Sequence, residues 1–341
     1  YMSNKICMND IAEALNMSRN TISKAFNNQY LPEKTRTLIL NKAIELGYKN
    51  LDQVSKRETI LHKKNILILT INDIQNLNFF LSVIRGIDSI VSKYDLNLFQ
   101  YQFDSLQKIK DFKGYVEAKN ISGILCLETF NKKYICQILN LNIPVVFIDS
   151  AINTFHSRGN YDIVLMENIG SVKNTMLQVA KTSPIHSFGF VGDFEHCLSF
   201  NERFIGYREA LFQLEIPYTK EYNITEPDEF PYGNISILSR KLSTMNRLPE
   251  CFVCANDFIA ISIINALQAL EKRVPEDVQV IGFDNTQDAK NFSVPLTTID
   301  TDKELLGKEG IVTLLNRIKY IEDTNRVIHI KTSSIFRATT K

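Results

Sequence analysis

Four hydrogen-bonding side chains share one face of a helix predicted over residues 19–27: Arg19, Asn20, Ser23 and Lys24. The opposite face of this helix is apolar. Arg and Lys suit the guanine edge in the major groove of DNA, and Asn suits the adenine edge. A reading helix presents its first turn to base edges, which is where these side chains gather. The segment therefore predicts recognition of DNA bases.

Two further helices must position this face. A short helix is predicted to start at Asp10, and a third is predicted at about residues 33–46. Asn16 and Met17 form the predicted turn, and Ser18 can cap the second helix by accepting hydrogen bonds from its free N–H groups. The pattern predicts a helix-turn-helix. A small three-helix domain with a solvated polar face is the structural alternative.

A second group of residues suits the binding of hydroxyl groups. Asp149 and Asp284 each follow a buried apolar run that predicts a strand, so both belong at the carboxyl edge of a sheet. A carboxylate there can accept two vicinal hydroxyl protons, Arg203 can donate, and Asn256 can do both. Phe79 can stack on the apolar face of a sugar. The alternatives are helix capping for the two aspartates and a core position for Phe79.

The amino-acid composition and the distribution of charge limit the class of protein to which the chain can belong. The chain has 341 residues, 44% apolar and 23% charged, which is typical of a soluble protein of two or three domains. Its net charge is +1, but residues 1–64 hold 11 Lys and Arg against six Asp and Glu, a local net charge of +5. The remaining residues therefore carry −4. A basic head on an acidic body fits a DNA-binding module joined to a part with another role.

No enzyme, metal or cofactor is expected. The five histidines match no ligand or triad spacing, and the chain has neither a nucleophile elbow nor a phosphate-cradling glycine motif. Cys251-x-x-Cys254 lies in an apolar run, which favours a buried strand over a metal or redox site. The sequence has no apolar run of about 18 residues and no signal-peptide core, so a cytoplasmic location is expected.

Strand-like runs alternate with helical periodicity beyond residue 64. Strands are predicted at 66–71, 96–101, 122–127, 144–148, 161–166, 187–191, 251–255 and 278–283. Helices are predicted at about 79–94, 106–119, 131–141, 168–182, 200–215, 233–245, 257–271 and 302–319. This alternation predicts an α/β body of two doubly wound parallel-sheet lobes with a ligand cleft between them.

The expected organisation is a helix-turn-helix head over 1–48, a linker or hinge over 49–64, and an effector-binding and dimerisation domain over 65–341. Within that domain, lobe 1 is expected at about 65–159 and 291–322, and lobe 2 at about 160–290 and 323–341.

Several motifs resemble the lactose-repressor (LacI/GalR) family of bacterial regulators. They are Asp10-Ile-Ala12, Met17-Ser-x-x-Thr-Ile-Ser-Lys24, Leu46-Gly-Tyr48, Arg203-x-x-Gly-Tyr207, Ala255-Asn-Asp257 and Val274–Asp284. The resemblance extends over the whole chain. It implies a repressor of a carbohydrate-use operon, acting on operator DNA as a homodimer. It also implies lobes like those of type I periplasmic sugar-binding proteins, with a sugar-like effector between them.

The resemblance also assigns residues. The DNA-binding residues it implies are Ser18, Arg19, Asn20, Thr21, Ser23, Lys24, Asn27 and Tyr48. The effector-binding residues it implies are Phe79, Asp149, Arg203, Asn256 and Asp284. No catalytic residue, metal ligand or cofactor is implied.

The chain departs from the family pattern in two places. The segment after Tyr48 lacks the usual proline and the spacing of the hinge helix that kinks the operator, although Leu51 or Val54 can serve as a wedge. The first-lobe motif reads Leu77-Asn-Phe-Phe80 in place of Asn-Pro-Phe-Phe. Two alternatives stay open: a purine or phosphosugar as the effector, and a solute-binding receptor with no role on DNA. The last residues contain no leucine heptads, which favours a dimer over a tetramer.

Overall fold

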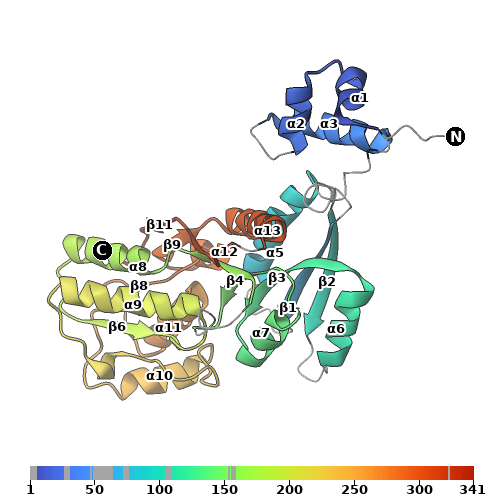
Figure 1. The fold of residues 1–341 in the computed structure, drawn as a ribbon. Helices are drawn as coiled ribbons and strands as arrows, with labels where there is room; N and C mark the ends of the chain where they lie inside the picture. The colour runs from blue at the N-terminus through green and yellow to red at the C-terminus, as the bar shows by residue number, and fades with distance from the viewer. Residues whose placement is uncertain are drawn as a thin grey trace. The chain divides into compact units, whose positions relative to one another are not determined.

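The computed structural model of the protein describes residues 6–26, 31–46, 48, 64–71, 77–94, 96–103, 109–152, 154, 159–321 and 323–341. The chain divides into two compact units, Tyr1–Lys64 and Asn65–Lys341, which we call the head and the body (Figure 1). Within the described ranges, no helix combines the length and apolar character needed to cross a bilayer.

Three helices form the head: α1 (Met8–Ala14), α2 (Arg19–Phe26) and α3 (Glu33–Glu45). Their apolar faces meet around Ile11, Ile22 and Ile39, each of which is fully buried. Ser18 Oγ accepts a hydrogen bond from the backbone N–H of Thr21 at 3.1 Å. This bond satisfies a free donor in the first turn and determines where α2 begins.

The first lobe of the body is built on a six-stranded sheet in the order β10-β5-β4-β3-β1-β2. The bounds of these strands are β1 (Lys64–Ile71), β2 (Leu96–Phe103), β3 (Ile121–Thr129), β4 (Val145–Ser150), β5 (Tyr161–Met166) and β10 (Val327–Ile330). The pairs β1–β3, β3–β4, β4–β5 and β5–β10 are all parallel. Such a sheet needs cover on both faces.

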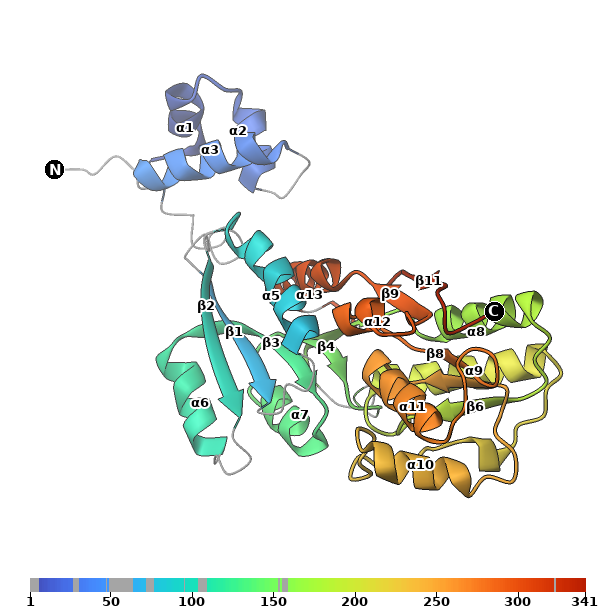
Figure 2. The same cartoon turned by 180° about the vertical axis from the view of Figure 1, so that it is seen from behind.

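Helices cover both faces of this sheet. They are α5 (Leu77–Val91), α6 (Ile109–Ala118), α7 (Lys132–Leu139) and α13 (Lys303–Lys319). Ile66 and Ile68 of β1 belong to the same apolar cluster as residues of α5 and α13, whereas Leu67 and Leu69 belong to the cluster with α6 and α7. The alternation of side chains along β1 therefore places α5 and α13 on one face and α6 and α7 on the other (Figure 2).

The second lobe contains a parallel sheet in the order β6-β7-β8 and an antiparallel pair, β11-β9. The strands are β6 (Phe188–Val191), β7 (Cys251–Cys254), β8 (Gln279–Ile281), β9 (Thr298–Thr301) and β11 (Thr332–Ile335). The helices are α8 (Ile169–Thr182), α9 (Leu198–Gln213), the 3₁₀ helix η2 (Lys220–Tyr222), α10 (Ile235–Ser243), α11 (Asp257–Ala269) and α12 (Gln287–Asn291). A parallel bridge between Ile281 and Thr297 links β8 to the segment before β9.

The described chain passes between the lobes at three points: residues 167–168 after β5, Asp302 before α13, and Lys331 between β10 and β11. The boundaries expected from the sequence lie instead at about 159/160, 290/291 and 322/323. The difference arises because β5 is buried along its whole length and pairs with β4, and because β10 pairs with β5. An apolar strand pattern does not reveal which of two sheets the strand joins.

Candidate nucleic-acid interface and effector cleft

The outward face of α2 carries polar side chains in its first two turns. Among the residues predicted to contact DNA, Ser18, Arg19 and Asn20 are exposed, and Thr21, Ser23 and Lys24 are half-buried. Asn27 lies outside the described residues. Ile22 on the opposite face is fully buried, so the helix cannot turn its polar side inward without losing its core contact. The polar side of α2 therefore remains accessible to a partner.

Tyr48, which the resemblance assigns to DNA contact, is largely buried in the head. Its side chain is 8% exposed, and its ring lies 5.3 Å from that of Phe26 in the apolar core of the head. Its backbone N–H donates to the carbonyl of Ala43 at 3.0 Å. Tyr48 thus closes the core of the head, because its large ring fills the space beside α2. The candidate hinge wedges, Leu51 and Val54, lie outside the described residues.

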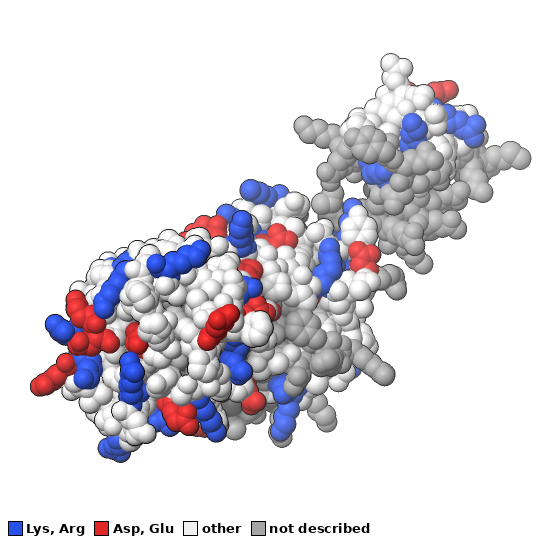
Figure 3. All heavy atoms as spheres, turned by 90° about the vertical axis from the view of Figure 1, so that its left-hand side faces the viewer, with Lys and Arg blue, Asp and Glu red and all other residues white. Residues whose placement is uncertain are grey.

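The surface of the body has a mixed charge. On the face seen in Figure 3, Lys and Arg side chains are interspersed with Asp and Glu, and neither sign forms a continuous area. A polyanion such as DNA attracts surfaces where positive charge is concentrated. In this chain the excess of +5 lies within residues 1–64. Charge therefore favours the head as the DNA-binding part.

A cavity of about 290 Å³ lies between the two lobes of the body. All five residues predicted to bind an effector line this cavity: Phe79, Asp149, Arg203, Asn256 and Asp284. Phe79 and Asp149 belong to the first lobe, and the other three belong to the second. Ligand pockets commonly measure roughly 300–1,000 Å³, so this cavity suits one small molecule.

Three acidic residues of the cavity lie near strand ends with left-handed backbone. The φ angles are +49° at Glu128, +58° at Asp149 and +109° at Asp284. Non-glycine residues seldom adopt positive φ, and such strain is typical of functional sites. The backbone N–H of Asp284 donates to the carbonyl of Ile299 at 2.9 Å, which helps to hold the turn. These turns place the carboxylates at the carboxyl edges of the sheets.

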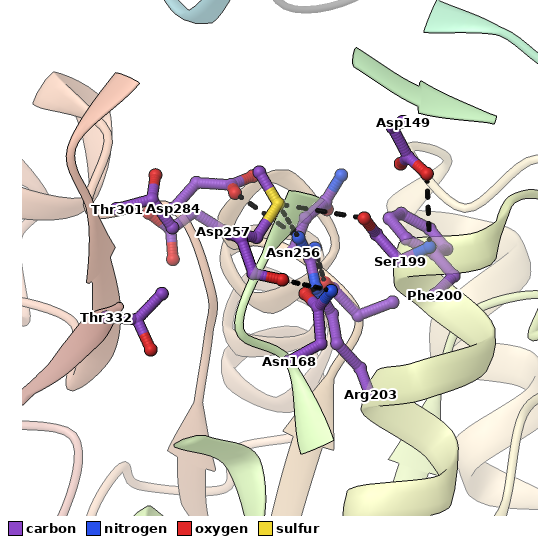
Figure 4. Close-up of polar contacts among 12 residues, drawn as sticks. Asp149, Asn168, Ser199, Phe200, Arg203, Asn256, Asp257, Asp284, Thr301 and Thr332 are labelled. Atoms are coloured by element: carbon purple, nitrogen blue, oxygen red, sulfur yellow. Dashed lines mark hydrogen bonds and ion pairs between the residues drawn. The ribbon is translucent and has the colours of Figure 1, made fainter. Parts of the chain in front are cut away.

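Arg203 on α9 forms the wall of the cavity beside the crossing of the chain. Its Nε donates to Asn168 Oδ1 at 2.9 Å, and Nη1 donates to the carbonyl of Ala255 at 2.6 Å (Figure 4). Its Nη2 lies 3.7 Å from Asp284 Oδ1, and the guanidinium lies 3.6 Å from the centre of the Phe283 ring. Arg203 is therefore held rigidly, with its charge near the strand-end carboxylate.

Asn256 and Asp257 open α11 but have different surroundings. Asn256 Oδ1 accepts a hydrogen bond from the N–H of Ile259 at 2.9 Å and caps the helix, so its NH₂ is the group it can offer a ligand. Asp257 is fully buried and accepts from the hydroxyl of Thr298 at 2.5 Å and the N–H of Thr286 at 2.7 Å. Burial, followed by the charge of Asp284, raises the pKa of Asp257 to about 7. Asp257 thus acts as a structural acid that joins α11 to β9.

The cavity also contains residues that the sequence did not predict. These include Glu128, Phe130, His196 and Phe200. Glu128 follows an apolar run just as Asp149 does, so the same strand-end argument applies to it. His196 lies in a loop with no periodic pattern. Its Nδ1 lies 2.7 Å from Asp228 Oδ2, and its ring lies 4.8 Å from the ring of Phe130.

The electrostatics of the cavity reflect burial of like charges. Burial, followed by the charges of Asp149 and Asp284, raises the pKa of Glu128 to about 7. Burial also raises the pKa of Asp149 and of Asp284, although Arg203 opposes the rise at both. Burial lowers the pKa of His196, but the hydrogen bond and charge of Asp228 outweigh it, and the net direction is upward. The wall is therefore predominantly acidic.

Other titratable groups of the described chain form no second centre. No cluster of three or more His, Cys, Asp and Glu side chains within the described ranges is arranged to hold a metal ion. Cys251 and Cys254 are free thiols buried in β7, and burial raises the pKa of each. A thiol with a raised pKa is a poor nucleophile.

Comparison with known proteins places the fold and the site in context. Residues 184–340 match the family model of the periplasmic binding protein-like domain. The chain is 27% identical over 336 residues to the HTH-type transcriptional repressor PurR of Vibrio parahaemolyticus, covering 97% of this chain and 98% of that protein. It is 28% identical over 351 residues to the probable HTH-type transcriptional repressor ExuR of Bacillus subtilis, covering 98% and 100%.

Solved structures share the architecture. The transcriptional regulator CelR in complex with cellobiose superposes with a TM-score of 0.69 at 20% identity, covering 98% of this chain and 99% of that one. The lac repressor dimer bound to operator and an anti-inducer gives a TM-score of 0.67 at 19% identity, covering 99% of both. A LacI-family regulator of Enterococcus faecium with bound ribose gives 0.65 at 22% identity, covering 81% and 98%. With its head, its two lobes and these relatives matched along almost its whole length, the chain is similar to bacterial helix-turn-helix transcriptional repressors and has the fold of lactose-repressor-type regulators.

Proposed function

We propose that this protein represses transcription by binding operator DNA through its head, and that a small, sugar-like effector in the cleft of its body controls that binding. The observation that carries the proposal is the convergence of Asp149, Arg203, Asn256 and Asp284 on one cavity lined by both lobes. Carboxylates accept hydrogen bonds from hydroxyl groups, while Arg and Asn side chains donate hydrogen bonds to hydroxyl oxygens. A repressor of bacterial operons would act in the cytoplasm.

The effector acts through linkage. A ligand changes the affinity for DNA only if it binds two arrangements of the protein with different affinities. A ligand that contacts Asp149 of the first lobe and Arg203 of the second stabilises the arrangement in which both are within reach. A tenfold change in operator affinity requires about 1.4 kcal/mol of differential binding. One or two hydrogen bonds gained on closure supply that amount.

The operator would be pseudo-palindromic and read by a homodimer, with half-sites about one helical turn apart. Leu81 on α5 is 45% exposed and Leu305 on α13 is 41% exposed. The two helices pack side by side on one face of the first lobe (Figure 2). We take this face, Leu81 with Leu305, as the candidate dimer interface, and we call it the α5–α13 face.

The test uses the full chain. Selection of the DNA duplexes that the protein binds from a random library identifies the operator. Fluorescence anisotropy then measures the affinity of the protein for this operator with and without each of a panel of neutral sugars. We expect selective operator binding that at least one sugar raises or lowers. A chain with equal affinity for selected and random duplexes would contradict the repressor. A chain that responds to a purine or a phosphosugar, and to no neutral sugar, would reassign the effector class.

A further inference from the structure

The wall of the cavity carries more acid than base. The carboxylates that line it are those of Glu128, Asp149 and Asp284. Only Arg203 and His196 among its described lining residues can carry positive charge, and each already lies beside a carboxylate. Arg203 Nη2 is 3.7 Å from Asp284, and His196 Nδ1 is 2.7 Å from Asp228. An anionic ligand would therefore find little free positive charge here.

The carboxylates are short of donors. The side chain of Asp284 is 9% exposed and lines the cavity, yet no described residue donates a hydrogen bond to its carboxylate. Arg203 Nη2 lies 3.7 Å from that carboxylate, and Lys303 Nζ donates to the backbone carbonyl of Asp284. Glu128 likewise receives no hydrogen bond from the described chain. Asp149 is better satisfied, because its Oδ1 accepts from the N–H of Ser150 at 2.7 Å and of Ser199 at 3.3 Å. A buried carboxylate without donors is costly, so a ligand that donates to it is favoured.

Neutral and positively charged donors of a ligand differ in their effect on this acidic wall. A hydroxyl donates a hydrogen bond but leaves the charge of the wall unchanged, whereas a protonated amine donates and also neutralises. Burial, followed by the charges of Asp149 and Asp284, raises the pKa of Glu128 to about 7, so holding its negative charge in the cavity is costly. A cation in the cavity would remove that cost, and a phosphate or carboxylate would increase it.

Aromatic side chains complete the environment. Phe79, Phe130 and Phe200 line the same cavity. The face of an aromatic ring attracts a cation and also packs against the C–H face of a sugar ring. Rings and carboxylates together suit a ligand that combines a polyol framework with a positive charge.

We propose that Glu128, Asp149 and Asp284 select an effector that carries a protonated amine among its hydroxyl groups, an amino sugar or amino polyol, and reject phosphorylated and uronic sugars. This inference rests on the function proposed above and names the ligand class of the same cleft. Glu128 is the specificity residue, because its carboxylate has no donor from the described protein and faces the charges of the other two acids.

Matched pairs of sugars test the inference with the full chain. Isothermal titration compares glucosamine with glucose, galactosamine with galactose, and mannosamine with mannose. The pH is about 7.3, which lies above the pKa of about 7 of Glu128 and below the ordinary pKa of about 7.7–8.0 of an α-amino group, so that both groups are mostly charged. Glucose 6-phosphate and glucuronate serve as anionic probes. We expect at least one amine to bind about tenfold or more tightly than its hydroxyl parent, and the anions to bind more weakly than either. Equal or tighter binding of every parent sugar, tighter binding of an anion, or no binding of any amine would overturn the inference.

Two variants assign the preference to one carboxylate. Glu128→Gln keeps the length of the side chain and removes its charge, so the preference for the amine should fall to about threefold or less. Glu117→Gln makes the same change on the exposed surface of α6 and should keep the full preference. If the two variants retain the same preference, Glu128 is not the selecting residue.

Operator binding measured in parallel separates the two proposals. A chain without a specific operator contradicts the proposed function. A chain that binds its operator and responds to a neutral or acidic sugar, but to no amine, contradicts only the inference about the ligand class.

Discussion

A hydrogen bond between Glu202 and His329 joins the two lobes beside the crossing of the chain. Glu202 Oε1 on α9 lies 3.1 Å from His329 Nε2 on β10. Its other oxygen accepts from Asn168 Nδ2 at 2.8 Å, and Asn168 Oδ1 accepts from Arg203 Nε at 2.9 Å. Three consecutive hydrogen bonds thus connect a strand of the first lobe to the arginine of the cavity.

The pH dependence of stability tests this contact. The hydrogen bond that the His329 ring donates to Glu202 raises the pKa of His329, partial burial opposes it, and the charges of Glu202 and Glu167 add to the rise. Because the folded state favours the charged ring, this stabilisation is complete below about pH 6.5 and is lost as the pH rises through the folded pKa. Between about pH 6 and pH 8, the wild type should therefore lose more free energy of unfolding than His329→Gln in urea denaturation.

The control for this prediction is His186→Gln, which changes an exposed histidine of the second lobe. Its free energy of unfolding should change with pH as that of the wild type does. If the free energy of unfolding has the same pH dependence in the wild type and in His329→Gln, the contact with Glu202 contributes no charge-dependent stability.

Glu128→Gln should stabilise the protein at high pH. The folded pKa of Glu128 is raised to about 7, chiefly by burial, so its contribution to stability is present below about pH 4 and is lost as the pH rises to 7. The free energy of unfolding of the variant should exceed that of the wild type by about 1–2 kcal/mol near pH 8. This value is discounted because the carboxylate borders the open cavity. The two should converge near pH 4, as chemical denaturation can show. A variant that is less stable than the wild type near pH 8 would contradict the acidic cavity.

Arg203→Lys should impair effector binding. Lysine keeps the charge but lacks the planar fork that reaches Asn168, Ala255 and Asp284 together. We expect the affinity for the effector to fall by about tenfold or more in titration calorimetry. Arg208→Lys, an exposed change on the same helix, is the matched control. Equal affinities for the two variants would remove Arg203 from the binding site.

Asn20→Ala should relax base preference at one or two operator positions. Asn20 is exposed in the first turn of α2, and an Asn–adenine pair is worth roughly 1–3 kcal/mol of discrimination. Binding to a set of single-base operator variants measures the effect, with Asn41→Ala on the exposed face of α3 as the control. A uniform loss of affinity across all variants would identify Asn20 as a backbone contact.

Light scattering should give the mass of two chains at micromolar concentration. Leu81→Lys on the α5–α13 face should yield monomers and weaker operator binding, because two linked heads bind with higher avidity than one. Phe212→Lys on α9, where the ring is 88% exposed, should leave the dimer intact. Dissociation by Phe212→Lys in place of Leu81→Lys would move the interface to the second lobe, and a mass near four chains would contradict the dimer.

The fold was predictable wherever a strand or helix buries one regular face. The expected strand at 122–127 corresponds to β3, and the expected helix at 302–319 corresponds to α13. Strands β9, β10 and β11 were not predicted from the sequence. Strands β10 and β11 are short and half-exposed, so their apolar pattern is weak. Membership of a lobe depends on pairing between distant segments, which the local pattern of β5 does not encode.

The candidate site was predictable in part, because strand ends converge at the edge of a parallel sheet. Asp149 and Asp284 satisfy that rule and line the cavity. Glu128 satisfies it too and was missed, although it follows an apolar run. His196 has no local signal, because only the fold brings its loop near the cavity. The place of Tyr48 in a family motif did not indicate that its ring lies in the core of the head.

The three passages between the lobes bear on how the chain is made. The face of the first-lobe sheet that α13 covers includes Leu125, Val146 and Ile148, and α13 is supplied only by residues 303–319. A ribosome therefore synthesises β1 to β5, and then nearly the whole second lobe, before that face can be closed. Until then the nascent sheet exposes apolar side chains, the condition under which a growing chain aggregates or recruits chaperones. The interleaved topology that creates the cleft thus makes the first lobe begin early in synthesis and finish late.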